Sequence, residues 1–261
     1  MSKISEKKRI VIKIGSSSLT HSTGMLNIRK IETFVKVLAD LKNSGKEIIL
    51  VSSGAQAVGI GKLGLKEKPK DIPTKQAVAA IGQCELMYIY DKQFSMYNHI
   101  VSQVLLTKDV VDVDARKQNV INTLSRLLEI GSIPVINEND TVSYEEIEFG
   151  DNDTLSAIVG ELIQTDLLII LSDIDGLYDK DPHKFDDAKL IPVVNEIDDR
   201  IISLAGDAGS NLGTGGMITK IHAAQISNKA GFDMVIMNGA NPVELYDLFE
   251  NKPVGTIFKA N

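Results

Sequence analysis

The sequence predicts an α/β protein, a three-layer αβα sandwich with an open, mostly parallel central sheet. Three observations lead to this fold class. Apolar runs of strand length occur along the whole chain, amphipathic helical patterns lie between them, and the two kinds of segment alternate. Strands that are apolar throughout need cover on both faces of the sheet, and the helices of a parallel arrangement provide that cover.

In the first half of the chain, the alternation begins with a buried strand at residues 9–14. Apolar residues then recur at helical spacing from Ile28 to Leu41, with Asn27 placed to cap the start and Gly45 to end the last turn. The pattern continues with a strand at 46–51, a long helix around 74–98, a strand near 100–106, a helix at 114–130 and a strand at 133–136.

The same rhythm resumes from Asp151 with a helix that carries Leu155 and Leu162, a strand at 167–171, a helix after Gly216 and a strand at 234–237. Between them, residues 137–149 read NENDTVSYEEIEF, which predicts a polar turn followed by an exposed β-hairpin. No linker rich in Pro, Gly or Ser divides the chain. We therefore expect one continuous domain over residues 1–261, with two lobes.

Composition narrows the classes of function. The chain has 261 residues, 43% hydrophobic and 24% charged, which is ordinary for a globular protein with a substantial core. Its formal charge of -7 argues against a nucleic-acid partner, because binding to phosphate backbones needs clustered cations. No signal peptide and no apolar run long enough for a membrane are visible, so we expect a cytoplasmic protein. The single Cys84 excludes an internal disulfide.

Two lysines in glycine-bearing segments are the strongest functional signal. Lys13 lies in RIVIKIGSSSL, and Lys220 lies in GLGTGGMITK ahead of a helical pattern. Backbone amides exposed at a helix start form a cradle for anions, and an ammonium group beside each cradle neutralises phosphate charge. The pair predicts a site for nucleotide phosphates.

Each lysine also needs a negative partner. Lys13 sits in a buried apolar strand, and Lys220 sits in the first turns of a helix, where a cation opposes the helix dipole. The GDND sequence offers Asp151, Asn152 and Asp153 at a helix start. Asp151 alone also fits a simple helix cap, but three polar residues exceed what one cap needs. We expect them to bind a substrate ammonium and to orient the lysines, with Asp153 in the orienting role.

Unusual sequences follow four of the predicted strands. KIGSSS, SSGA, NENDT and SDIDGLYDKDP all come where a strand ends. Taken singly, each also fits an ordinary turn. Because the carboxyl ends of parallel strands share one edge of the sheet, we expect the four segments to meet in one crevice.

Three motifs are set aside. A GxGxxG run at residues 59–64 follows a helix-like AQAV, whereas a dinucleotide site needs a preceding strand. The aspartates of SDIDGLYDKDP resemble a calcium loop, but the glycine comes too early and no terminal glutamate follows, so we favour a turn that lines a nucleotide base and ribose. The four histidines lack the spacing of zinc ligands, and no metal-binding residues are predicted.

The motifs KIGSSSL, VSSGA, PVINENDTV, FGDNDTLSA, SDIDGLYDKDP and GLGTGGMITK together resemble the amino-acid kinase family, in family order and over essentially the whole chain. The resemblance implies ATP-dependent phosphorylation of the γ-carboxylate of L-glutamate to L-glutamyl 5-phosphate, the first step of proline biosynthesis from glutamate, with Mg²⁺ accompanying ATP. It also implies a substrate lobe at about 1–165 and a nucleotide lobe at about 166–261.

The resemblance assigns roles residue by residue. The catalytic set comprises Lys13, Asp153 and Lys220. The residues that contact glutamate are Ser53, Asn137, Asp140, Asp151 and Asn152. The residues that line the nucleotide site are Lys13, Gly15, Ser172, Asp173, Thr214, Gly215, Gly216, Met217, Ile218, Thr219 and Lys220.

Several alternatives stay open at this point. Other members of the family phosphorylate N-acetylglutamate, aspartate or uridylate, although NENDTV with GDND favours a free amino acid. A sensor that keeps the fold without turnover is a second class, opposed by the joint presence of Lys13, Asp153 and Lys220. The resemblance further predicts feedback inhibition by proline and a homo-oligomer, either a dimer or a tetramer. Many relatives append a C-terminal PUA domain, which we do not expect here.

Overall fold

A computed structural model describes residues 3–21, 23–107, 113–142, 152–182, 184–207 and 216–260. Its strands are β1 Arg9–Ile14, β2 Glu47–Ser52, β3 Val101–Leu106, β4 Ile133–Glu138, β5 Leu167–Ser172, β6 Val193–Val194, β7 Asp233–Asn238 and β8 Thr256–Phe258. Its helices are the 3-10 helix η1 Ile4–Glu6 and the α-helices α1 Ser16–Leu19, α2 Ile28–Asn43, α3 Ala55–Leu63, α4 Ile72–Ser95, α6 Asp114–Glu129, α7 Asn152–Leu162, α8 Asp199–Asp207, α9 Met217–Ala230 and α10 Glu244–Phe249.

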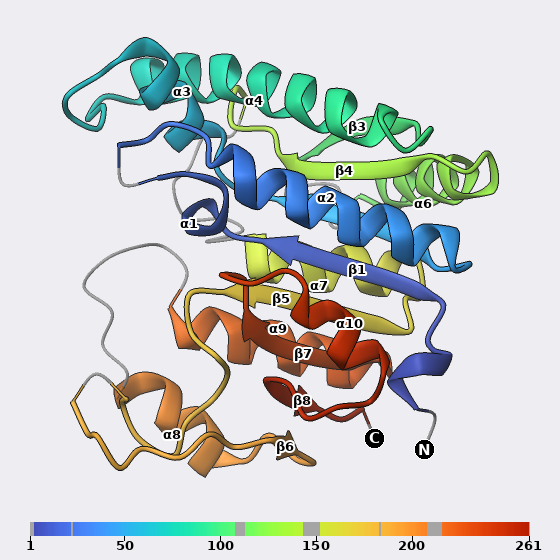
Figure 1. Cartoon of the computed structure of the whole chain (residues 1–261), viewed down its shortest axis with the longest axis vertical. Helices are drawn as coiled ribbons and strands as arrows, with labels where there is room; N and C mark the ends of the chain where they lie inside the picture. The colour runs from blue at the N-terminus through green and yellow to red at the C-terminus, as the bar shows by residue number, and fades with distance from the viewer. Residues whose placement is uncertain are drawn as a thin grey trace.

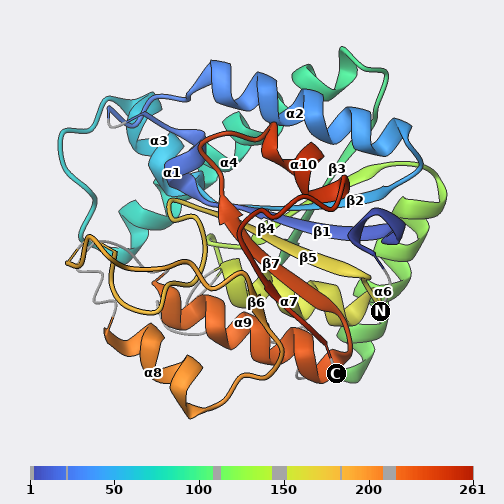
Figure 2. The ribbon, with the colours of Figure 1, turned by 60° about the horizontal axis from the view of Figure 1, so that its bottom comes forward.

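The strands form one mixed sheet between two layers of helices. Within the described ranges, eight strands are ordered β3-β4-β2-β1-β5-β7-β8-β6. The pairs from β3 through to β7 are all parallel, whereas β7 and β8 are antiparallel. Figure 2 shows α2 and α10 on one side of the sheet and α7 and α9 on the other. The predicted three-layer, mostly parallel sandwich is confirmed.

Two apolar cores lie on the two faces of the sheet. Alternate residues of β1 divide between them, with Ile10 and Ile12 packing toward α2 and α4 and Val11 packing toward α7 and α9. This alternation is the period of two expected of a strand. Lys13 shares the face of Val11, and its strand neighbours are Val51 of β2 and Ile170 of β5. Its side chain is therefore directed toward the layer of α7 and α9.

The observed boundaries of several elements differ slightly from the predicted ones. The helix predicted at 74–98 begins at Ile72, because Asp71 accepts a hydrogen bond from the Thr74 backbone N–H at 2.9 Å. It ends at Ser95, and Asn98 has a left-handed φ of 60°. The turn predicted from residue 137 was placed too early, since Asn137 and Glu138 still pair with β3 as part of β4. Most of the predicted hairpin, residues 143–149, lies outside the described residues.

The GxGxxG run is a helix-packing motif. Gly59 and Gly61 lie within α3, and Gly64 caps its end. A Cβ at Gly59 would stand 2.0 Å from the Val78 carbonyl oxygen, and one at Gly82 would stand 1.7 Å from the Ala55 carbonyl oxygen. Only glycines allow α3 and α4 to approach so closely.

Candidate active site

A buried trio of charged side chains lies at the carboxyl end of β1. The Lys13 Nζ is 2.7 Å from one carboxylate oxygen of Asp153, and the Lys220 Nζ is 3.1 Å from the other. The Thr219 Oγ1 lies 2.9 Å from the oxygen that Lys220 contacts. Asp153 is fully buried, and the two lysines are 7% and 4% exposed. The fold thus brings together residues about two hundred positions apart in the sequence.

Three different elements deliver the trio. Lys13 comes from β1, Asp153 from the first turn of α7, and Lys220 from the first turn of α9. Figure 1 shows α7 and α9 next to the strands β1, β5 and β7. A carboxylate near a helix N-terminus is stabilised by the helix dipole, whereas an ammonium group there is not. Asp153 therefore compensates Lys220 for an unfavourable position.

The electrostatics of the trio favour an anionic ligand. Burial raises the pKa of Asp153, but the charges and hydrogen bonds of Lys13 and Lys220 outweigh it and hold the pKa below its ordinary value. The carboxylate therefore stays ionised at neutral pH. Two ammonium groups then face one carboxylate, which leaves positive charge in a weakly solvated place. A phosphoryl group carries the charge that suits it.

The described glycines of the two segments, Gly15 and Gly216, come close to this trio in the chain or in space. Gly15 precedes α1, and a Cβ built on it would be 3.8 Å from the Lys13 Nζ, so the backbone passes close to the ammonium group. Gly216 is the N-cap residue of α9 and makes no side-chain cap hydrogen bond to the first backbone N–H groups of that helix. Such N–H groups are donors for an anion. The backbone at Gly15 and the start of α9 therefore lie near the two ammonium groups.

The remaining nucleotide-site predictions fall in two places. Ser172 is the last residue of β5, and its hydroxyl donates a hydrogen bond to the Asp173 Oδ1 at 3.2 Å. Asp173 is exposed. In α9, Met217 is buried in the core whereas Ile218 is 53% exposed. Thr214 and Gly215 lie outside the described residues, as does Asp151.

Beside the trio, Asn152 connects the ends of β2 and β4. Its amide Nδ2 donates to the Ser53 Oγ and to the Asn137 Oδ1, both at 2.9 Å, and lies 3.2 Å from the Ser52 carbonyl oxygen. Gly54, with a φ of 102°, turns the chain from β2 into α3 just after Ser53. Three of the five residues predicted to bind an amino acid, Ser53, Asn137 and Asn152, thus share hydrogen bonds beside Asp153.

Asp140 lies just beyond β4 in the same region. Burial, and secondly the charge of Glu138, raise the pKa of Asp140 from 3.8 to about 6. A nearby cation would stabilise the ionised form of this buried carboxylate and lower its pKa. Asp140 is therefore suited to receive an ammonium group.

Sequence reasoning missed two polar residues of α4 that support this region. Gln83 accepts a hydrogen bond from the Asn137 Nδ2 at 2.9 Å, and the Tyr90 hydroxyl lies 2.9 Å from the Ser52 Oγ. Burial raises the pKa of Tyr90, so its phenol is neutral. They are seven residues apart and share one face of the helix. A glutamine at a core position of an apolar helical pattern was the available signal.

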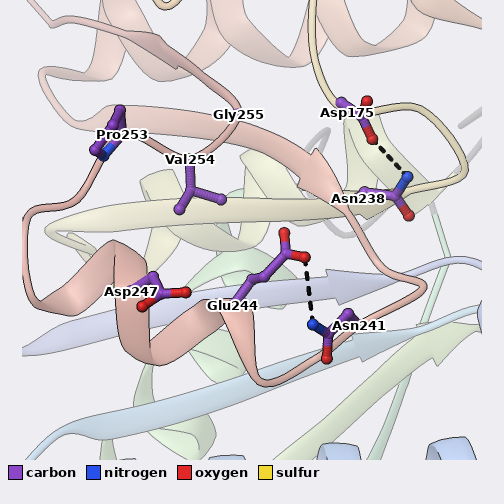
Figure 3. A pocket seen from close by; sticks show the side chains of 8 residues that line it. All are labelled: Asp175, Asn238, Asn241, Glu244, Asp247, Pro253, Val254 and Gly255. Atoms are coloured by element: carbon purple, nitrogen blue, oxygen red, sulfur yellow. Dashed lines mark hydrogen bonds between the residues drawn. The ribbon is translucent and has the colours of Figure 1, made fainter.

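A separate pocket of about 400 Å³ lies beside α10 (Figure 3). Asp175 and Asn238 meet on one side of it, and Glu244 and Asn241 meet near the start of the helix. With Asp247, three carboxylates line the pocket. Because carboxylates repel phosphates, we assign the phosphate-binding role to the lysine trio and not to this pocket.

Two further features concern residues 3–21, 23–107, 113–142, 152–182, 184–207 and 216–260. No three His, Cys, Asp or Glu side chains gather there as a metal site. No helix in those ranges is both long enough and apolar enough to cross a bilayer.

The fold and the paired lysines together define a phosphotransferase class of protein. The model of the amino acid kinase family matches residues 8–238, and the chain belongs to this family. A UMP kinase from Bacillus anthracis shares the fold, with a TM-score of 0.67 and 14% identity over 98% of this chain and 97% of that one.

More similar relatives are named for one activity. Glutamate 5-kinase from Clostridium perfringens is 52% identical over 98% of this chain and 97% of its own length. Glutamate 5-kinase from Listeria innocua is 51% identical over 98% of this chain and 94% of its own.

Proposed function

We propose that this protein is a glutamate 5-kinase, which transfers the γ-phosphoryl group of ATP to the γ-carboxylate of L-glutamate and yields L-glutamyl 5-phosphate and ADP. The relatives at about 50% identity over nearly the whole chain support the substrate. The observation that carries the chemistry is the meeting of Lys13 and Lys220 on one buried carboxylate. In the pathway that the activity implies, the product is committed to proline biosynthesis.

The reaction needs positioning and charge neutralisation more than acid–base chemistry. An oxygen of the substrate carboxylate attacks the γ-phosphorus, the bond from that phosphorus to the bridging oxygen breaks, and ADP leaves with the electron pair. The nucleophile is already ionised, so no general base is required. Charge spreads over the equatorial oxygens of the transferring group, where donors held in place in advance stabilise it.

In this proposal, the two lysines flank the transferring group. Lys13 acts from β1 and Lys220 from α9, while Asp153 holds both ammonium groups at fixed positions. Repulsion between ATP and the substrate carboxylate is the main obstacle to their approach, and two positive charges reduce it. The N-terminal amides of α9, which follow Gly216, add donors for the phosphates.

Nucleotide and Mg²⁺ enter this site together. Because Mg²⁺ in nucleotide sites is held largely by substrate phosphates, we assign the phosphates of ATP as its main ligands. When bound, the ion would neutralise phosphate charge and orient the γ-phosphoryl group. Ser172 and Asp173, at the end of β5, and residues 214–220 are assigned to the nucleotide.

Glutamate occupies the region between Asn152 and Asp140. Ser53 and Asn152 bind its α-ammonium and α-carboxylate groups, and Asn137 supports Asn152 through a hydrogen bond. Asp140 also receives the α-ammonium group. Asp151 is assigned to the same subsite. Feedback inhibition by proline and assembly into a dimer or tetramer remain predictions that follow from the family.

Asp140 gives this site a pH dependence. Its pKa is raised to about 6, so kcat/KM for glutamate should fall as the pH drops through about 6, because a neutral carboxyl group no longer attracts the substrate ammonium. The variant Asp140→Asn should raise KM by roughly tenfold or more and should lack this inflection. The measurement is kcat/KM for glutamate from about pH 5 to about pH 8 in the wild type and in the variant. An unchanged inflection in the variant would assign it to another group.

A substrate panel tests the function. Hydroxylamine traps an acyl phosphate as a hydroxamate, and the assay compares glutamate, aspartate and N-acetylglutamate at saturating ATP and Mg²⁺. We expect kcat/KM to be highest for glutamate by at least about tenfold, since a shortened chain or a blocked amine leaves buried polar groups without partners. Preference for either competitor, or ATP binding without turnover, would contradict the proposal.

A further inference from the structure

A buried chain of amides runs from α4 to the proposed glutamate subsite. Gln83 accepts a hydrogen bond from the Asn137 Nδ2, and the Asn137 Oδ1 accepts one from the Asn152 Nδ2. Both distances are 2.9 Å. Gln83 and Asn137 are 9% and 4% exposed, so water does not readily replace a lost partner. The orientation of one amide in this chain therefore fixes the next.

Backbone groups set the direction of the chain. The Glu138 backbone N–H donates to the Asn137 Oδ1 at 2.9 Å, and a backbone N–H can only donate. The oxygen of Asn137 must therefore face that N–H, and its NH₂ group must face Gln83. At the other end, the Ser52 carbonyl oxygen can only accept, which places the NH₂ group of Asn152 against it.

This arrangement decides which atoms remain for a ligand. The two protons of the Asn152 NH₂ group are shared among three protein acceptors, so within the part of the chain that the structure describes its Oδ1 is the amide atom left to contact a substrate. The Ser53 hydroxyl accepts from Asn152, which leaves its own proton free to donate. An acceptor beside a donor matches the α-ammonium and α-carboxylate groups of an amino acid.

We propose that Gln83 is a positioning residue that enforces selection for the α-ammonium group of the substrate, an inference that rests on the proposed function. Gln83 holds one edge of the Asn137 amide while Glu138 and Asn152 hold the other. Without the Gln83 acceptor, the NH₂ group of Asn137 is buried without that partner and the amide tilts to find another. Asn152 then loses a hydrogen bond, and its oxygen is no longer held toward the ammonium group.

The test compares glutamate with glutarate, which has both carboxylates and no amine. In Gln83→Met, of similar length but without the acceptor, KM for glutamate should rise about fivefold to tenfold while kcat stays within about threefold. The ratio of kcat/KM for glutamate over glutarate should fall by a similar factor. Gln83→Glu keeps an acceptor oxygen at the same position and should restore most of the ratio.

Gln93→Met is the matched control, since Gln93 is another buried glutamine of α4, at 8% exposure. It should keep the wild-type ratio even if thermal unfolding shifts as much as in Gln83→Met. An unchanged ratio in Gln83→Met, equal loss in Gln83→Glu, or the same loss in Gln93→Met would overturn the inference. Absence of glutamate turnover in the wild-type protein would instead contradict the proposed function.

Discussion

Replacing Lys13 with methionine is expected to lower kcat by at least about a hundredfold, with a much smaller change in KM for glutamate. Lys13 and Lys220 share one carboxylate, so the site keeps no excess positive charge once one lysine is lost. The transferring group then develops its charge without one of its two donors. Methionine is similar to lysine in length and keeps an apolar stem at this position of β1. Steady-state kinetics with glutamate and ATP measures the effect.

Stability should change little in this variant, because Asp153 keeps its contact with Lys220. Lys62→Met is the control, since Lys62 pairs with Glu85 on the surface and such pairs contribute little. It should leave kcat unchanged. If Lys13→Met instead raised KM with kcat intact, Lys13 would bind the ground state and transition state equally, and its proposed role would be wrong.

The second large effect is expected for Asp153→Asn, which should reduce both stability and turnover. Without the carboxylate, two buried ammonium groups face each other, and losing one partner of a buried ion pair costs about 3–5 kcal/mol. Because the lysines also lose their fixed positions, kcat should fall by roughly a hundredfold or more. Urea unfolding and steady-state kinetics measure the two effects.

The stability difference should depend on pH in a defined direction. The pKa of Asp153 is depressed below 3.8, so its contribution is present above that value and is lost as the pH falls through the lower, folded-state pKa. Wild type and Asp153→Asn should therefore converge only in strong acid. A difference that vanished already near neutral pH would mean that Asp153 is not the ionised partner of the lysines.

The sequence predicted the fold well where the signal was local. Long apolar strands and amphipathic helices such as α2 have strong periodicity, and the cap at Asn27 is present as a hydrogen bond from the Lys30 backbone N–H. Short elements were missed, among them α1 and α10 and the strand β6, because four to six helical residues or two strand residues carry little periodicity. Tertiary packing sets those elements.

The candidate site divides in the same way. A lysine in an apolar strand predicted a negative partner for Lys13, and Asp153 forms that ion pair. The role of Gln83 could not be predicted although its core position in a helical pattern was a signal, because its contact with Asn137 depends on how α4 packs against the end of β4. The close approach of α3 to α4 through Gly59 and Gly82 is likewise a property of the folded chain.

The central claim is that two distant lysines act together on one transferring phosphoryl group. A crystal structure of the protein with ADP, aluminium fluoride, Mg²⁺ and glutamate tests it most directly, because the fluoride complex occupies the position of that group. We expect the Nζ atoms of Lys13 and Lys220 both to lie within about 3 Å of its equatorial ligands, with Asp153 still contacting each lysine. A complex in which either ammonium group remains beyond hydrogen-bonding reach of those ligands would contradict the account.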